Sequence, residues 1–163
     1  MSRVAIFIGS DSDAEVIQET IGALEGFGIS YTLEVTSAHR SPGRTLSLIR
    51  KAEAQGAAVF IAAAGKAAHL AGLVAAHTIR PVIGVPLESS SLGGLDALLS
   101  TVQMPKGVPV ATMALGRTGA ANAAYLAAQI LGLSDPALKD KLEQHKKKME
   151  DKVGEASLKL RRK

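Results

Sequence analysis

The chain has 163 residues, no cysteine and 47% hydrophobic side chains, which predicts one globular domain and excludes both a disordered polymer and thiol chemistry. Its net charge of +4 lies in the tail, because residues 139–163 carry a net +5 and the rest a net −1. Only 3% of residues are aromatic, so we expect no nucleic-acid partner. No apolar run is long enough to span a bilayer and no stretch resembles a signal peptide, so we expect a cytoplasmic protein without a membrane partner.

Short apolar runs alternate with amphipathic segments along the first 131 residues. The runs predict strands at residues 4–8, 31–35, 57–63, 81–86 and 108–115. The first helix is expected to start at a capping box formed by Ser12 and Glu15 and to end near Gly26 and Gly28. Further helices are expected at 44–55, in a short segment ending near 77, at 95–103 and at 120–131. Strands that alternate with helices predict a parallel five-stranded sheet covered on both faces, an α/β/α sandwich forming one domain over residues 1–135.

Residues 136–163 differ from the rest of the chain. Apolar residues recur there mostly three or four positions apart, or at multiples of that spacing, between lysines and glutamates, which predicts an amphipathic helix. Gly154 interrupts the pattern. Two interpretations stay open: a helix that packs on its own domain, and an arm that packs on a neighbouring subunit.

Polar loops follow the first three predicted strands, and in a parallel sheet they all leave at the edge where ligands bind. The first is GSDSD at 9–13, which opens a helix. Backbone N–H groups at a helix start favour an anion, and the hydroxyls of Ser10 and Ser12 add donors. The loop therefore suits a phosphate or a ribose hydroxyl, although the same residues also make a plain capped helix start.

The second and third loops carry the groups best suited to acid–base chemistry. In SAHRSPG, His39 follows Ser37 and suits proton transfer near neutral pH, while Arg40 suits a phosphate. In GKAAHLAG, Gly65 lets a ligand approach the backbone, and Lys66 places a charge where a buried strand ends. His69 is either a second site residue or a satisfied structural histidine.

The remaining features predict no further chemistry. The fourth loop, LESSSLGGLD, has hydroxyls and glycines and suits a flexible flap. His77 and His145 lie in predicted helices away from the loops, and we expect both to be structural. The sequence has neither a P-loop nor GxGxxG, no GxSxG, and no metal-ligand spacing of His, Asp and Glu, so we expect no organic cofactor and no metal.

Taken together, the loops resemble those of the PurE family, enzymes of the carboxyaminoimidazole ribonucleotide step in purine synthesis. The resemblance is in family order and at family spacing, and it covers most of the chain to about residue 131. The matching stretches are GSDSD (9–13), SAHRSPGR (37–44), AAGKAAHLAG (63–72), PVIGVP (81–86), GLDALLSTVQMPKGVPVAT (94–112) and GAANAAYLAAQIL (119–131).

The resemblance implies a flavodoxin-like fold assembled as an octamer, with sites between subunits and C-terminal helices that reach neighbours. In the class I enzymes, N5-carboxyaminoimidazole ribonucleotide becomes 4-carboxy-5-aminoimidazole ribonucleotide without metal or cofactor. The carboxylate leaves as carbon dioxide and is re-attached to the ring carbon. A functional link to an ATP-dependent synthetase that makes the substrate is also implied.

The resemblance further implies roles for single residues. Ser10, Asp13 and Arg40 would hold the ribose and phosphate, with Ser12 in the same loop. His39 would be the general acid/base and Ser37 would support the substrate beside it. The remaining residues would meet the migrating carboxylate: Gly65, the next residue Lys66, His69 and Leu70.

The chain departs from the class I pattern in the third loop. Most class I members read AGGAAHLPG, whereas here Lys66 replaces the second glycine and Ala71 the proline. Lys66 aligns with an arginine of the class II enzymes, which carboxylate aminoimidazole ribonucleotide directly. A class I mutase is the leading interpretation, and a carboxylase using carbon dioxide or a divergent, non-catalytic paralogue stay open.

Overall fold

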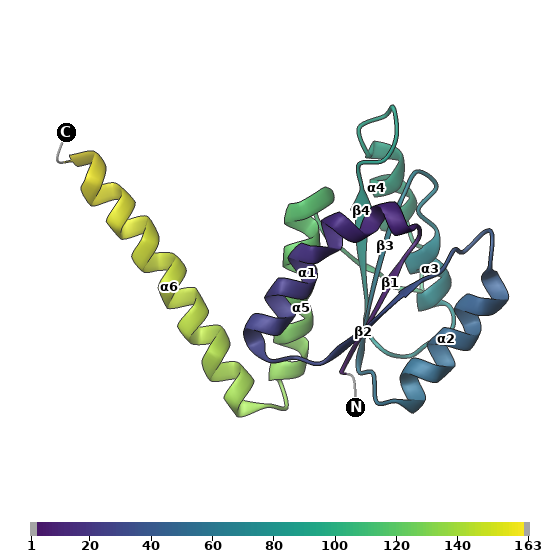
Figure 1. Ribbon diagram of the computed structural model, residues 1–163, viewed down its shortest axis with the longest axis horizontal. Helices are drawn as coiled ribbons and strands as arrows, with labels where there is room; N and C mark the ends of the chain where they lie inside the picture. Colours follow the sequence, from purple (N-terminus) through teal and green to yellow (C-terminus); the bar gives the residue numbers. More distant parts are fainter. Residues whose placement is uncertain (1–2, 162–163) are drawn as a thin grey trace.

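The computed structural model describes residues 3–161 and shows a parallel sheet with helices on both faces (Figure 1). Within this part of the chain the strand order is β2-β1-β3-β4-β5, and every neighbouring pair is parallel. The strands are β1 (Val4–Ile8), β2 (Tyr31–Val35), β3 (Val59–Gly65), β4 (Val82–Leu87) and β5 (Ala111–Thr112). The predicted α/β/α sandwich of the flavodoxin-like type is confirmed.

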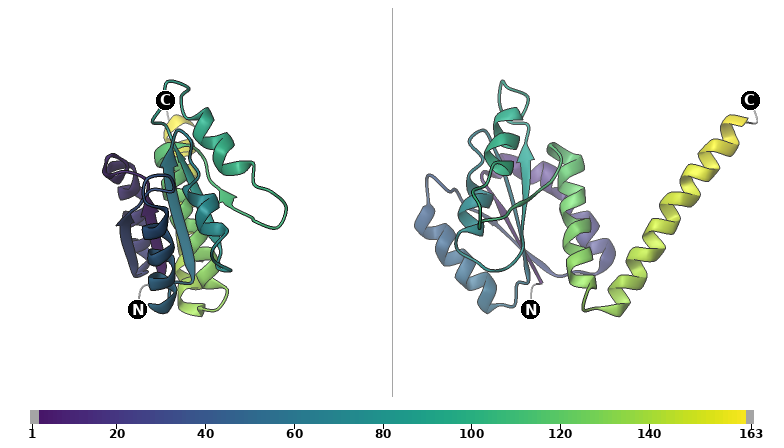
Figure 2. Two further views of the ribbon diagram at one scale, coloured as in Figure 1. Left: turned by 90° about the vertical axis from the view of Figure 1, so that its right-hand side faces the viewer. Right: turned by 180° about the vertical axis from the view of Figure 1, so that it is seen from behind.

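The helices divide between the two faces of the sheet, as the turned views show (Figure 2). The helices α1 (Ala14–Phe27) and α5 (Gly116–Gly132) pack together on one face, over a cluster that includes Ile6 and Ile61. The other face is covered by α2 (Pro42–Ala54) and α3 (Leu70–Ala75) over Phe7 and Phe60. The helix α4 (Leu95–Val102) lies on the same face as α3. A Cβ atom added to Gly84 of β4 would contact Thr101 of α4 and Ala71 of α3.

Two strands were predicted with the observed bounds and three were not, of which β4 is displaced by one residue from the predicted 81–86. All five residues of β1 are buried, which is why a continuous apolar run marks it, and β2 also has its predicted bounds. The strand β3 extends to Gly65, two residues beyond the predicted end, so Lys66 follows the strand directly. The predicted strand 108–115 pairs only over Ala111–Thr112, since it is the edge strand and Pro109 has no N–H to donate.

Helix starts differ more than helix ends. A 3₁₀ turn, η1 (Asp11–Asp13), precedes α1, and its capping box is formed by Ser10 and Asp13, so the predicted Ser12–Glu15 box was wrong. The helix α2 begins at Pro42, two residues early, because proline is well suited to a first helical position. The helix α5 begins at Gly116, four residues early.

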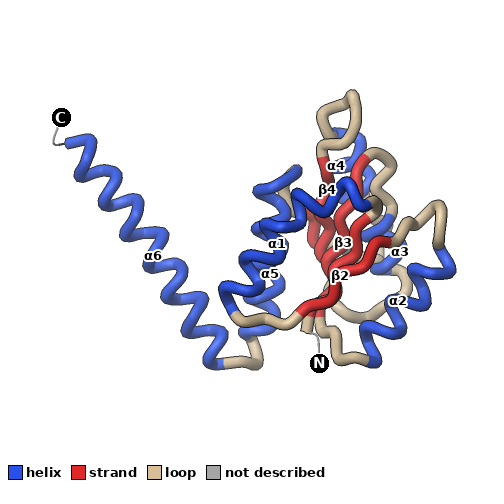
Figure 3. The backbone as a smooth tube through the Cα atoms, viewed as in Figure 1, coloured by secondary structure: helices blue, strands red, loops and turns tan. Residues whose placement is uncertain are grey.

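The last helix, α6 (Pro136–Arg161), leaves the body of the molecule (Figures 1 and 3). Its first turns are anchored: Leu138 is buried, the Lys141 ammonium donates to the carbonyl of Phe27 at 2.8 Å, and His145 stacks on Tyr125. The helix then continues without a break through the glycine at 154, which was predicted to interrupt it. None of the helices described within residues 3–161 is long and apolar enough to cross a membrane.

Candidate active site

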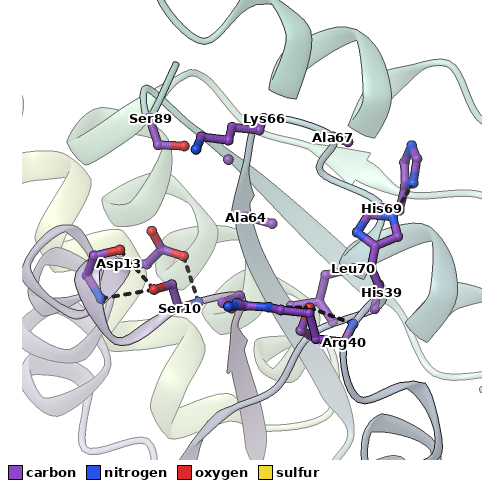
Figure 4. Close-up of a pocket in the computed structure, with 15 residues that line it drawn as sticks. Ser10, Asp13, His39, Arg40, Ala64, Lys66, Ala67, His69, Leu70 and Ser89 are labelled. Carbon is purple, nitrogen blue, oxygen red and sulfur yellow. Dashed lines mark hydrogen bonds between the residues drawn. The ribbon is translucent and has the colours of Figure 1, made fainter.

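A pocket of about 550 Å³ lies at the carboxyl ends of the central strands, where the loops after β1, β2, β3 and β4 meet (Figure 4). In parallel sheets this is the edge at which ligands bind. The structure brings together in its wall every site residue predicted from the sequence: Ser10, Ser12, Asp13, Ser37, His39, Arg40, Gly65, Lys66, His69 and Leu70.

The loop after β1 provides hydroxyls and one buried carboxyl. The N–H of Ser10 donates to Oδ2 of Asp13 at 3.0 Å, and the hydroxyl of Ser12 donates to that of Ser10 at 3.0 Å. Burial raises the pKa of Asp13, and the hydrogen bond from the Ser10 N–H opposes that shift. Hydrogen bonds from the Ser10 hydroxyl and the Ser12 N–H lower the pKa of the neighbouring Asp11. This wall therefore offers neutral donors and a fixed acceptor, which suit ligand hydroxyls.

Arg40 links the loops after β1 and β2. One terminal nitrogen of its guanidinium donates to the carbonyl of Gly9 at 2.9 Å, and Nε donates to the hydroxyl of Ser37 at 3.4 Å. The other terminal nitrogen, NH1, has no hydrogen-bond partner among residues 3–161. A guanidinium fixed on two sides and open on the third is suited to bind a phosphate.

His39 and His69 meet across the pocket, although they are thirty residues apart in the chain. Nε2 of His39 lies 2.7 Å from Nδ1 of His69, and the rings cross at 72°. His69 occupies the N-cap of α3, so the short helix fixes its backbone against the loop that carries His39. One nitrogen of this pair must donate and the other accept, so a proton can be held between the two rings. The contact places His69 in the pocket wall beside His39.

Gly65, the last residue of β3, and Lys66, which follows it, lie beside the loop after β4. A Cβ atom on Gly65 would lie 1.6 Å from the hydroxyl oxygen of Ser89, so any larger residue there would displace the Ser89 side chain. Ser89 lines the pocket and was missed in the sequence. The predicted serine-rich flap was the only signal for it, and three consecutive serines gave no means of choosing among them.

The two remaining histidines lie outside the pocket, where they were predicted to be structural. His77 lies in the turn after α3, not in a helix as predicted, and its Nδ1 is 2.8 Å from the carbonyl of Leu73. His145 packs its ring between those of Phe27 and Tyr125. Leu70, by contrast, is buried beneath the site and gives the pocket an apolar floor.

A doubly covered parallel sheet with a histidine pair and an anion-suited arginine at its carboxyl edge defines an enzyme-like site for a small anionic molecule. The family model described as AIR carboxylase matches residues 3–152. The chain belongs to this family, the PurE family, as its sequence predicted.

Named relatives are similar over nearly the whole chain. N5-carboxyaminoimidazole ribonucleotide mutase of Pyrococcus horikoshii is 50% identical over 96% of this chain and 88% of its own length. The mutase of Escherichia coli K12 is 48% identical over 93% and 90%. The crystal structure of Treponema denticola PurE is 30% identical, covers 96% of this chain and 97% of its own, and superposes with a TM-score of 0.88.

Proposed function

We propose that the protein is an N5-carboxyaminoimidazole ribonucleotide mutase, which produces 4-carboxy-5-aminoimidazole ribonucleotide in purine biosynthesis. The observation that carries the proposal is the pair of His39 and His69, 2.7 Å apart in a pocket that also holds Arg40. Relatives with this name that are 48–51% identical support it. The substrate is a small anionic ribonucleotide, which matches the hydroxyl-rich and cationic walls.

The chemistry moves one carboxyl group and conserves protons. The bond between the exocyclic amino nitrogen and the carboxyl carbon breaks, carbon dioxide leaves, and the amino nitrogen takes a proton. The ring carbon then attacks carbon dioxide and loses its own proton, so the proton count of the substrate is unchanged. The oxidation state does not change either, so the step requires no redox cofactor.

In this proposal His39 is the general acid/base, since a histidine can give and accept a proton near neutral pH. Its hydrogen-bonded neighbour His69 orients the ring and holds the shared proton. Arg40 binds the phosphate, Ser10, Ser12 and Asp13 bind the ribose, and Ser37 supports Arg40 through the contact at 3.4 Å. Carbon dioxide released in the pocket forms beside the ring carbon, which replaces a dilute reactant by a large effective concentration.

A pair of substrates tests the reaction. With purified enzyme, we expect N5-carboxyaminoimidazole ribonucleotide to be converted to the 4-carboxy product without added bicarbonate, measured by absorbance of the product. Aminoimidazole ribonucleotide plus bicarbonate at physiological concentration should react far more slowly. Turnover of only the second substrate would identify a direct carboxylase, and turnover of neither by a folded protein would identify a divergent paralogue.

We further propose that α6 is an arm that packs on a neighbouring subunit of an octamer. Four apolar residues of its distal half are exposed, with 48–74% of their surface free in the single chain: Met149, Val153, Leu158 and Leu160. Met149, Val153 and Leu160 share one face of the helix, whereas Leu158 lies on the opposite side. An exposed apolar face favours burial against another subunit, at about 1.5–3 kcal/mol for each side chain fully buried.

Charges placed on this face should break the assembly. We expect the double variant Val153→Asp and Leu160→Asp to sediment as a species smaller than the wild type at the same concentration. The control Lys152→Gln, on the same helix, should leave the mass unchanged. An unchanged mass for the double variant would contradict the proposal that α6 packs on a neighbouring subunit.

Two finer proposals follow from the same function. Because N5-carboxyaminoimidazole ribonucleotide is an unstable carbamate, an ATP-dependent synthetase in the same cell must supply it. We therefore place the enzyme in the cytoplasm beside that synthetase.

A further inference from the structure

Ser41 stands at the start of α2 but does not cap this helix. It occupies the N-cap position, where a serine hydroxyl ordinarily accepts a hydrogen bond from a backbone N–H of the first helical turn. Within the described residues 3–161 its side chain makes no such bond. The Ser41 hydroxyl turns back instead toward the loop after β2, where its oxygen accepts the N–H of Ser37 at 3.0 Å. The hydroxyl of this capping residue therefore serves the loop and not the helix.

Ser37 and Ser41 close the turn that carries His39 and Arg40. The backbone N–H of Ser41 donates to the carbonyl of Ser37 at 3.0 Å, and the Ser41 hydroxyl donates to the same carbonyl at 3.3 Å. The Ser37 N–H donates in the opposite direction, to the Ser41 hydroxyl. His39 lies in the middle of this closed turn, so the position of its backbone depends on the bonds between the two serines.

Two buried threonines hold Ser41 from beneath. The backbone N–H and the hydroxyl of Thr45, near the start of α2, both donate to the carbonyl of Ser41, at 3.1 and 3.2 Å. The hydroxyl of Thr36, which follows β2 directly, lies 2.7 Å from that of Thr45 and donates to it, because the Thr45 proton goes to the Ser41 carbonyl. Neither threonine has more than 2% of its surface exposed. Buried hydrogen bonds are costly to leave unmade, so this cluster ties the turn to both β2 and α2.

The direction of these hydrogen bonds keeps the Ser41 hydroxyl occupied within the loop. Its proton goes to the carbonyl of Ser37 and its oxygen accepts the Ser37 N–H. Ser41 is also not among the residues that line the active-site pocket. The Ser37 hydroxyl, by contrast, lines the pocket and accepts the N–H of Arg40 at 3.2 Å, so its own proton can reach a ligand. Ser41 thus acts through the turn and does not itself meet the substrate.

We propose that Ser41 is a positioning residue, which acts on the reaction by fixing the turn that carries His39. The inference rests on the general acid/base role proposed above for His39. The ring of His39 must reach Nδ1 of His69 at 2.7 Å, while His69 is fixed separately at the N-cap of α3. A hydrogen bond weakens steeply as its distance and angle change, so a small movement of the turn separates the two rings. Proton transfer to and from the substrate depends on the same placement of His39.

The variant Ser41→Ala tests the positioning role, since alanine removes the hydroxyl from a helix start that it does not cap. We expect kcat to fall about tenfold or more, measured well below the unfolding temperature of the variant. In the crystal structure of the free variant, Nε2 of His39 should lie more than about 3.5 Å from Nδ1 of His69, outside hydrogen-bond range. Ser41→Thr keeps the hydroxyl and should restore both the rate and the contact. Thr45→Val, which removes one donor to the Ser41 carbonyl, should lose less activity than Ser41→Ala.

The control is Ser47→Ala, which removes an exposed hydroxyl of α2 that donates to the carbonyl of Gly43, outside the pocket. It should match the wild type in kcat and in the distance between His39 and His69. A wild-type kcat in Ser41→Ala, an unmoved histidine contact, or no recovery in Ser41→Thr would overturn the positioning role. Failure of the wild type itself to convert the carboxylated substrate would instead overturn the mutase function, and the crystallographic distance would still test the positioning of His39.

Discussion

Replacing His39 with asparagine is expected to lower kcat by about 10²–10⁴-fold while the protein still folds and binds substrate. Asparagine keeps a polar group of similar size near His69 but cannot take the proton from the ring carbon. The exposed position of His39 means that no core packing is lost. Steady-state rates, with substrate affinity measured separately by calorimetry, give the comparison.

The matched control is His77→Asn, which removes a histidine outside the pocket, in the turn after α3, where its Nδ1 lies against the carbonyl of Leu73. It should retain wild-type kcat. His69→Asn should fall between the two, since it removes the partner of His39 but leaves the base in place. A kcat for His39→Asn within tenfold of the wild type would remove His39 from the role of general acid/base.

The fold was predictable wherever burial alone decides the structure. The strand β1 is apolar at every position because it is covered on both faces, and its bounds follow from composition. The strand β5 is different, because its length depends on which N–H groups reach β4. Similarly, the start of α1 depends on whether Ser10 or Ser12 caps the turn. Each serine has an acidic residue three positions later, so the capping-box spacing fits both.

The site was predictable as a set of loops but not as a geometry. Parallel topology places the ends of β1, β2 and β3 at one edge, so the ten predicted residues gather in one pocket. The contact between His39 and His69 depends on the path of two loops, which no local pattern specifies. The positive φ of Lys66 was equally hidden, since nothing in GKAAHLAG states which residue takes the turn.

The second large effect is expected at Gly119, in the first turns of α5. A Cβ there would lie 1.6 Å from the carbonyl oxygen of Ala114 and 2.6 Å from its carbonyl carbon, which are backbone atoms and cannot rotate away. The helix cannot easily shift either, because Thr20 of α1 donates a buried hydrogen bond to the carbonyl of Ala120 at 2.8 Å. We expect Gly119→Ala to lower the free energy of unfolding by about 3 kcal/mol or more.

The matched substitution is Gly22→Ala in α1, where a Cβ would meet no heavy atom within 4 Å. Alanine is the better helix former, so this variant should be more stable than the wild type by about 0.5–1 kcal/mol. At equal protein concentrations, the unfolding temperature should thus fall by about 10 °C for Gly119→Ala and rise for Gly22→Ala, although both variants replace a helical glycine with alanine. If Gly119→Ala unfolds at the wild-type temperature, the close approach of Ala114 to α5 is not a constraint on the fold.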